Sequence, residues 1–454
     1  MQVVVGGGVA GLHVSIELRR LGYHVILLER RPKLGGRWRT VYEGNEISYE
    51  AGAWRVDEKH ILCRRLFAKY KVDLTLQQRA IVLGKKKETI SPDEMLTGLT
   101  SWGAAAITQG VVHADAMDRN TGYTGETDSA WGSEPYAADG PFYVAPLGFD
   151  LLVDRMQSEA ERLGVQIWTD SRATDITHDE RLYTVLVKQR TGNQFVTHTL
   201  SATNVVLCAP PHVWREWPIF KKNARSLTSS VDAEVLHHIY VRWKDSKGPI
   251  PKESHIDETL GQIVTSQYDD SRWWQISYSS GRVARLWHNL ALHSPKGFLS
   301  RMRDAMRRAV SFDADFELKR HFWPFAIHKW KAVPNFDLSR AVAQSIRPNP
   351  ILLPGIFCAG EAFSSYQGWA EGALETSEMV LDHFRGKHEE DSARTSPRWT
   401  VFVEGRPIDV TKFKDVHPGG LGALMNHLGE NVDDFLLHVG HSDHAWAILH
   451  SLKG

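Results

Sequence analysis

The chain has 454 residues, of which 42% are hydrophobic and 24% charged, a length and balance that exclude a disordered chain and allow two or three packed domains. Lys and Arg together number 54, as do Asp and Glu, so no net charge favours a polyanion and we expect no nucleic-acid partner. Met1 leads directly into an apolar run without a basic leader, and no apolar run reaches the roughly 20 residues of a membrane span. We therefore expect a cytoplasmic protein.

The first 30 residues are predicted to form a strand, a glycine turn, a helix and a second strand. A β-branched run covers residues 3–5, apolar residues recur at helical spacing over 12–21, and a second apolar run covers 25–28. This order is typical of a βαβ unit, which predicts an α/β fold with a parallel sheet.

The turn between that strand and helix carries three glycines, and Glu29 ends the next strand. Gly6 permits a tight turn, Gly8 lets the backbone approach a pyrophosphate, and Gly11 lets the helix pack on the strand. Glu29 can accept hydrogen bonds from a ribose. The spacing predicts a dinucleotide site and does not distinguish FAD from NAD.

Further elements follow along the chain. Helices are predicted over residues 149–163, 296–310 and about 369–384, and strands over 165–169, 205–208, 235–243, 273–278 and 356–358. The charged, Ser- and Pro-containing residues 388–398 indicate a linker.

Two segments far apart in the chain carry a family resemblance. Residues 35–37 (Gly-Gly-Arg) follow the acidic residue, and residues 358–361 and 367–374 form a second motif near the far end. Together they resemble the flavin-containing amine oxidase family. The resemblance implies FAD, bound non-covalently because no cysteine lies just upstream of the second motif, and the implied contacts are Gly6, Gly8, Gly11, Glu29, Gly36, Arg37, Gly360, Glu361 and Gly368.

The resemblance also implies the domain order. It predicts a Rossmann-like FAD-binding domain and an α+β substrate domain that interrupt each other, followed by a linker and a small C-terminal domain. The expected boundaries are 1–76, 141–208 and 350–387 for the first, 77–140 and 209–349 for the second, 388–398 for the linker and 399–454 for the last.

Residues 52–60 resemble the segment that supplies the carboxylate-binding arginine in the L-amino acid oxidase branch. By this match Arg55 would bind the α-carboxylate of an amino acid and Trp369 would form an aromatic wall beside the flavin. The implied reaction is hydride transfer to flavin N5, after which the imine hydrolyses to a 2-oxo acid and ammonia. The alternative is that Arg55 forms a structural salt bridge to Glu50 or Asp57.

Several alternatives stay open. Many family members keep a lysine near flavin N5, and Lys221, Lys222 and Lys244 all lie near suitable predicted strands. With a structural Arg55 the chain would be a polyamine oxidase or a flavin-dependent desaturase. A non-catalytic flavin and haem electron-transfer adaptor is the alternative from another class.

The C-terminal residues resemble cytochrome b5. His417 lies in a His-Pro-Gly-Gly sequence and His441 in Gly-His-Ser, 24 positions further on, and the family uses this spacing for its two haem-ligating histidines. The resemblance implies a non-covalent b-type haem that would share with O2 the role of electron acceptor. The opening strand and helix of the family ahead of Trp399 are missing, and Leu436 occupies a position where the family has phenylalanine. The sequence predicts no oligomeric state.

Overall fold

The computed structural model describes residues 1–44, 46–77, 141–179, 181–244, 255–257, 260–264, 273–310, 315–331, 337–391, 400–403 and 406–411, and residues 427, 432 and 436. Most of the predicted substrate region 77–140, the predicted linker beyond residue 391, and both histidines predicted to bind haem, His417 and His441, lie outside the described residues.

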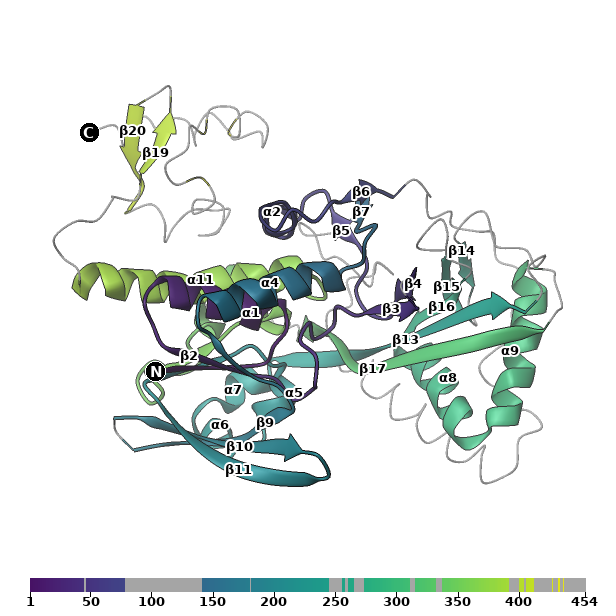
Figure 1. Cartoon of the computed structure of the whole chain (residues 1–454), viewed down its shortest axis with the longest axis horizontal. Coiled ribbons are helices and arrows are strands. Elements are labelled where there is room, and N and C mark those ends of the chain that lie inside the picture. The colour runs from purple at the N-terminus through teal and green to yellow at the C-terminus, as the bar shows by residue number, and fades with distance from the viewer. Residues whose placement is uncertain are drawn as a thin grey trace.

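A five-stranded parallel sheet forms the centre of the first domain (Figure 1). Its order is β18-β12-β1-β2-β8, and every neighbouring pair is parallel. This confirms the α/β class. The strands are β1 (Gln2–Val5), β2 (Val25–Leu28), β8 (Gln166–Trp168), β12 (Asn204–Leu207) and β18 (Ile356–Cys358).

The two faces of this sheet are covered differently because successive side chains of a strand point to opposite faces. Val4 and Leu27 pack with the long helices α1 (Val9–Arg20), α4 (Asp150–Arg162) and α11 (Ala370–Asp391). Val3 and Ile26 pack on the other side. The elements there are an antiparallel sheet of β9 (Ser171–His178), β10 (Tyr183–Thr191) and β11 (Gln194–Ala202), and the short helices α5 (Pro211–Trp214), α6 (Pro218–Asn223) and α7 (Arg225–Thr228).

A second large sheet is antiparallel and extends away from the first domain, with its two long strands β13 and β17 running outward to α8 and α9 (Figure 1). Its order is β14-β15-β16-β13-β17. Ile239 and Trp274 face the two helices in one apolar cluster. The elements are β13 (Val231–Trp243), β14 (His255–Asp257), β15 (Gly261–Val264), β16 (Trp274–Ser280), α8 (Gly281–His293), α9 (Pro295–Val310) and β17 (Phe316–Trp330).

Short elements complete the structure. The hairpin β3–β4 packs Tyr49 against Tyr240 of β13, with ring centroids 4.0 Å apart. The remaining elements are β3 (Thr40–Glu43), β4 (Glu46–Glu50), β5 (Val56–Asp57), α2 (Ile61–Lys69), β6 (Thr75–Leu76), β7 (Phe142–Val144), α10 (Leu338–Ser345) and the single turn Glu361–Phe363.

Two boundaries differ from those expected. Trp214 of α5, Phe220 of α6 and Val342 of α10 are buried with the parallel sheet, so both ends of the expected substrate segment 209–349 pack with the first domain. Helix α11 runs on to Asp391, into the expected linker 388–398, because neither glycine nor proline interrupts the chain between Gly386 and Pro397.

At the C-terminal end, β19 (Thr400–Val403) pairs with β20 (Arg406–Asp409). Val401 and Ile408 of this hairpin are buried with Val432 and Leu436, so Leu436 is an apolar core residue here. Within the described parts of the chain, none of the helices has the length and apolar character of a bilayer span.

The contact of Gly11 with the first glycine turn predicts a stability difference between two helical glycines. A Cβ on Gly11 would lie 1.8 Å from the carbonyl oxygen of Gly6, whereas one on Gly386 would meet no atom within 4 Å. We expect Gly11→Ala to destabilise the protein by more than about 2 kcal/mol and Gly386→Ala to stabilise it by about 0.5–1 kcal/mol. Urea unfolding measures both; equal effects would contradict the predicted contact.

Candidate active site

One large cavity lies beyond the carboxyl ends of β1, β2 and β12, where open parallel sheets bind their ligands. It encloses about 1600 Å³ of atom-free space, its open mouth included. Gly11 and Arg55 are outside its lining. Nine other sequence-predicted residues line it, namely Gly6, Gly8, Glu29, Gly36, Arg37, Gly360, Glu361, Gly368 and Trp369.

Two glycine turns form one end of this cavity. Gly6 has φ +109°, which favours glycine, and the backbone N–H of Gly35 donates to the carbonyl of Gly7 at 2.9 Å. A Cβ on Gly36 would lie 3.2 Å from Cα of Gly8, so the turns touch through backbone alone. Helix α1 begins behind Gly8 without a side-chain cap, so its first backbone N–H groups are available to an anion.

Glu29 ends β2 beside these turns and is 7% exposed. One carboxylate oxygen accepts the backbone N–H of Gly7 at 2.8 Å and the other that of Arg31 at 2.9 Å. An ionised carboxylate has about four acceptor sites. Two therefore remain for hydroxyl donors in the cavity.

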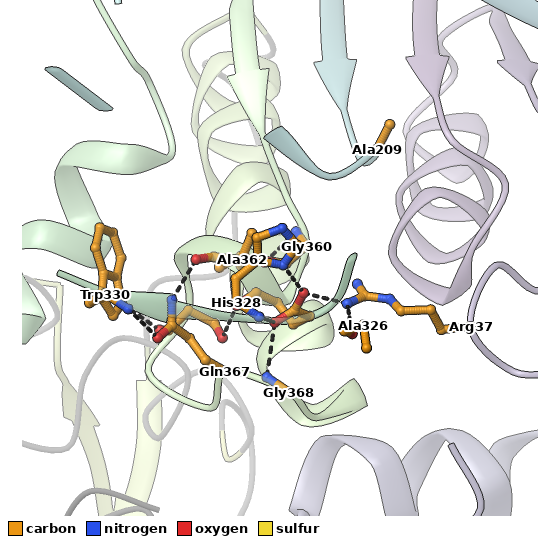
Figure 2. A network of polar contacts seen from close by, with 12 residues as sticks. Arg37, Ala209, Ala326, His328, Trp330, Gly360, Ala362, Gln367 and Gly368 are labelled. Carbon is orange, nitrogen blue, oxygen red and sulfur yellow. Dashed lines mark hydrogen bonds and ion pairs between the residues drawn. The ribbon is translucent and has the colours of Figure 1, made fainter. Parts of the chain in front are cut away.

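Figure 2 shows Arg37, His328 and Gly368, which come from three segments far apart in the chain, close together. The carboxylate of Glu361 joins them. It accepts hydrogen bonds from the guanidinium of Arg37, from Nδ1 of His328 at 2.7 Å and from the backbone N–H of Gly368 at 2.9 Å. Arg37 also donates to the carbonyl of Ala326 at 2.7 Å. These contacts join the second glycine turn to β17 and to the turn before α11.

The charge state of Glu361 follows from these partners. Burial alone would raise the pKa of Glu361, but Arg37 and His328 hold it well below its ordinary value, so the carboxylate is ionised. His328 must then carry a proton on Nδ1. Its Nε2 is buried and has no hydrogen-bond partner among the described residues.

Glu371, in the first turn of α11, ties this helix to α2. Its two carboxylate oxygens accept the backbone N–H groups of Leu62 at 3.0 Å and Cys63 at 2.8 Å. The carboxylate thus supplies the acceptors that the first turn of α2 lacks. The start of α11 and the start of α2 are consequently held together.

Arg55 lies next to the cavity rather than in its lining. Its guanidinium carbon is 4.6 Å from the ring centroid of Trp54 and 4.6 Å from that of Phe142. Nη1 is buried and has no hydrogen-bond partner among the described residues. No ion pair joins Arg55 to Glu50 or Asp57, so the alternative of a structural salt bridge to these residues is wrong.

Trp369 belongs to the same cluster of rings. Its ring is nearly parallel to that of Phe142, with centroids 6.3 Å apart and an interplanar angle of 9°, and its centroid is 4.7 Å from that of His60. Phe142 is therefore a neighbour of both the guanidinium of Arg55 and the indole of Trp369.

Two residues that line the cavity were not predicted from the sequence. His238 of β13 and Tyr278 of β16 line the cavity and are cross-strand neighbours, with ring centroids 4.6 Å apart. Burial raises the pKa of Tyr278 to about 12, although Arg55 acts to lower it, so the phenol keeps its proton. No local motif marks either residue, because only the pairing of two distant strands brings them together.

The three candidate lysines lie elsewhere. Lys221 pairs with Glu216 at 2.8 Å on the surface, and Lys222 and Lys244 are exposed. The described lining of the cavity contains no lysine. The structure therefore supports none of the three as the lysine near the flavin.

Comparisons with known proteins give family matches over most of the chain and shorter matches to individual proteins. A family described as flavin containing amine oxidoreductase matches residues 102–380, more than half of the chain, and an NAD(P)-binding Rossmann-like domain matches residues 4–67. An L-amino acid oxidase of Cerastes cerastes is 36% identical over 73 residues, which are 16% of this chain and 14% of that protein. A cytochrome b5 of Nicotiana tabacum is 45% identical over 51 residues, which are 11% of this chain and 37% of that protein.

Solved structures resemble the fold over a longer span. A protein described as a protoporphyrinogen oxidase from Exiguobacterium sp. 255-15 aligns with 85% of this chain and 98% of its own at a TM-score of 0.60 and 13% identity. A variant of putrescine oxidase aligns over the same shares at a TM-score of 0.59 and 14% identity. Identities this low show the fold alone.

The buried Glu371 predicts a characteristic pH dependence of stability. Burial raises the pKa of Glu371 to about 7, although the backbone N–H groups of α2 that it accepts act to lower this pKa. Such a carboxyl binds its proton more tightly in the folded state, so its stabilising contribution is full below about pH 4 and lost as the pH rises to about 7. Between pH 5 and 8 the wild type should lose roughly 2–3 kcal/mol relative to Glu371→Gln, as measured by urea unfolding.

Glu378, seven residues further along α11, provides the opposite control. Burial alone would raise its pKa, but His13 and Arg385 lower it to about 2, so its contribution is present above about pH 4 and lost as the pH falls towards 2. Glu378→Gln should keep the loss of stability that Glu371 causes between pH 5 and 8. A wild-type slope that Glu371→Gln does not alter would contradict the assignment.

Proposed function

The chain belongs to the flavin-containing amine oxidoreductase family, and from this we propose that it oxidises the α-amino group of an L-amino acid. It is an FAD-dependent oxidoreductase. Electrons would pass to O2, giving H2O2, or to a haem held by the C-terminal residues. With O2 as acceptor, the amino acid, O2 and water yield a 2-oxo acid, ammonia and H2O2.

The observation that carries the amino acid assignment is the guanidinium of Arg55, which has no counter-ion among the described residues. Burial lowers the pKa of Arg55, and an arginine keeps its charge in proteins regardless. A buried charge without a counter-ion is costly, by several kcal/mol or more. A substrate carboxylate would supply the missing charge and match the planar fork of donors that a lysine lacks.

Tyr278 and Trp369 support the same assignment. Tyr278 lines the cavity and its phenol keeps its proton, so we infer that the phenol would lie beside the same carboxylate. The indole of Trp369, backed by Phe142, would restrict where the substrate carbon can lie. We infer that these groups position the carbon–hydrogen bond.

The residues around the cavity suit FAD. The glycine turns at Gly8 and Gly36 leave room for a diphosphate against the free N–H groups of α1, and Glu29 keeps acceptor capacity for a ribose. Glu361 takes all its described hydrogen bonds from protein groups, so its contribution would be to hold Arg37 and the start of α11. When bound, FAD supplies the hydride acceptor of the reaction.

Two alternatives make different demands on Arg55. A polyamine oxidase or a desaturase would act on a substrate without a carboxylate, and Arg55 would then be structural. A non-catalytic electron-transfer adaptor would need no substrate at all. Arg55, which has no counter-ion among the described residues, favours the amino acid oxidase over both.

For the C-terminal residues we propose a b-type haem bound by His417 and His441. The support is their spacing of 24 positions and the likeness of a 51-residue segment to cytochrome b5. The core of Val401, Ile408, Val432 and Leu436 is small, and bound haem would add apolar contacts to it.

Substitution of Arg55 tests the amino acid assignment. Arg55→Ala should raise the KM for the preferred L-amino acid roughly 10- to 100-fold, because the carboxylate loses a charged hydrogen-bond partner, and Arg55→Lys should recover part of this loss. Arg64→Ala is the matched control, since Arg64 lies over the ring of Tyr143 at 5.1 Å but is exposed. Steady-state kinetics over a panel of twenty amino acids and common polyamines provide the measurement.

The alternatives give distinct results. An unchanged KM in Arg55→Ala, with polyamines as the better substrates, would establish the polyamine oxidase. Anaerobic flavin bleaching by none of the compounds would establish the adaptor.

Haem binding has its own spectroscopic test. The full chain should show the sharp reduced-state bands of a b-type haem, and His417→Ala or His441→Ala should abolish them because each removes one axial ligand. His444→Ala serves as the control within the same region. Full haem occupancy in both ligand variants would exclude this pair.

A further inference from the structure

A stacked pair of rings joins two parts of the molecule at the cavity. His212 belongs to the short helix α5, which follows β12 of the parallel sheet, and Phe325 belongs to β17 of the antiparallel sheet. Their ring centroids are 3.5 Å apart and their planes differ by 11°. Both residues line the cavity, so the pair links the wall that the first domain contributes to the wall that the second sheet contributes.

A bulge in β17 brings Phe325 to this position. The register of β17 against β13 shifts between Glu234 and Leu236, so that residues 324–326 of β17 stand opposite a single residue of β13. A bulge releases a side chain from the regular alternation of a strand and can direct it towards a site. Pro324 suits such a place because it has no N–H group to contribute to the ladder.

The imidazole of His212 acts as a neutral aromatic ring. Burial, and next His328 and three arginines, lower the pKa of His212 to about 3, so the ring carries no charge at neutral pH. Two of these arginines, Arg30 and Arg37, adjoin the glycine turns. His212 therefore lies near the end of the cavity where the diphosphate of a dinucleotide would bind.

Phe325 keeps part of its surface available to a ligand. The residue is 38% exposed although its ring stacks on His212. Because Phe325 belongs to the lining, its free surface borders the space that a cofactor would fill. A cofactor that packs against this ring removes apolar surface from water, which favours binding.

We propose that the stacked pair of His212 and Phe325 retains FAD in the cavity. Phe325 packs against the bound cofactor, and His212 fixes the Phe325 ring from the first domain, so that FAD leaves slowly. The inference rests on the binding of FAD in this cavity and makes no demand on the substrate. Since the two rings act through one contact, loss of either ring should release FAD faster.

The rate of FAD release from the full chain tests this role. The FAD-loaded protein is diluted into buffer without flavin, and the fluorescence of the released flavin is followed over time. Phe325→Ala and His212→Ala should each speed release roughly 3- to 10-fold, which is the effect expected for one aromatic pair. The double variant should be no faster than Phe325→Ala, because both substitutions remove the same contact.

Two further variants identify stacking as the cause. His212→Phe keeps a ring against Phe325 and should release FAD at nearly the wild-type rate. Phe322→Ala is the matched control, since Phe322 lies on the same strand and stacks on His288 at 3.6 Å, but neither residue belongs to the cavity lining. It should leave the release rate unchanged. Urea unfolding of the FAD-free forms checks that each variant is folded.

The outcomes separate this inference from the proposed function. Release that is equally fast, or equally absent, in the wild type and both alanine variants would overturn the retaining role and leave the oxidoreductase standing. Release from His212→Phe as fast as from His212→Ala would overturn stacking as the cause. A purified chain that neither contains FAD nor takes it up would overturn the inference together with the cofactor assignment.

Discussion

The buried carboxylate of Glu361 is the contact on which the arrangement of the cavity depends. Arg37 reaches it from the second glycine turn, His328 from β17 and Gly368 from the turn before α11. Three segments that are far apart in the chain are therefore aligned by one charge. A neutral side chain of similar size would offer fewer acceptor sites to these donors.

The sequence predicted those parts of the site whose structure depends on residues close together in the chain. Gly6 and Gly8 could be predicted because a local turn requires glycine there. Glu29 could be predicted because the length of the βαβ unit places an acidic residue at the end of its second strand. Glu361 was found only through a family resemblance, and its three partners could not have been predicted from spacing. The same holds for Arg55, whose neighbour Phe142 lies 87 positions further along the chain.

The residues missed by the sequence reasoning lie on strands whose pairing is long-range. Tyr278 meets His238 only because β16 pairs with β13 in one register, and a shift by one residue would turn His238 away from the cavity. The sequence left the lysine near the flavin open among Lys221, Lys222 and Lys244. Lys221 and Lys222 lie on helix α6 rather than on a strand, and Lys244 is exposed just beyond the end of β13.

The enclosure of Arg55 between Trp54 and Phe142 has a consequence for recognition by charge. Salt screens exposed ion pairs far more than enclosed ones. The affinity of Arg55 for an anionic group would therefore vary little with ionic strength. Amides and esters of an amino acid would fill the same volume but bring no full negative charge. They would be rejected without any steric barrier, because the guanidinium would stay uncompensated.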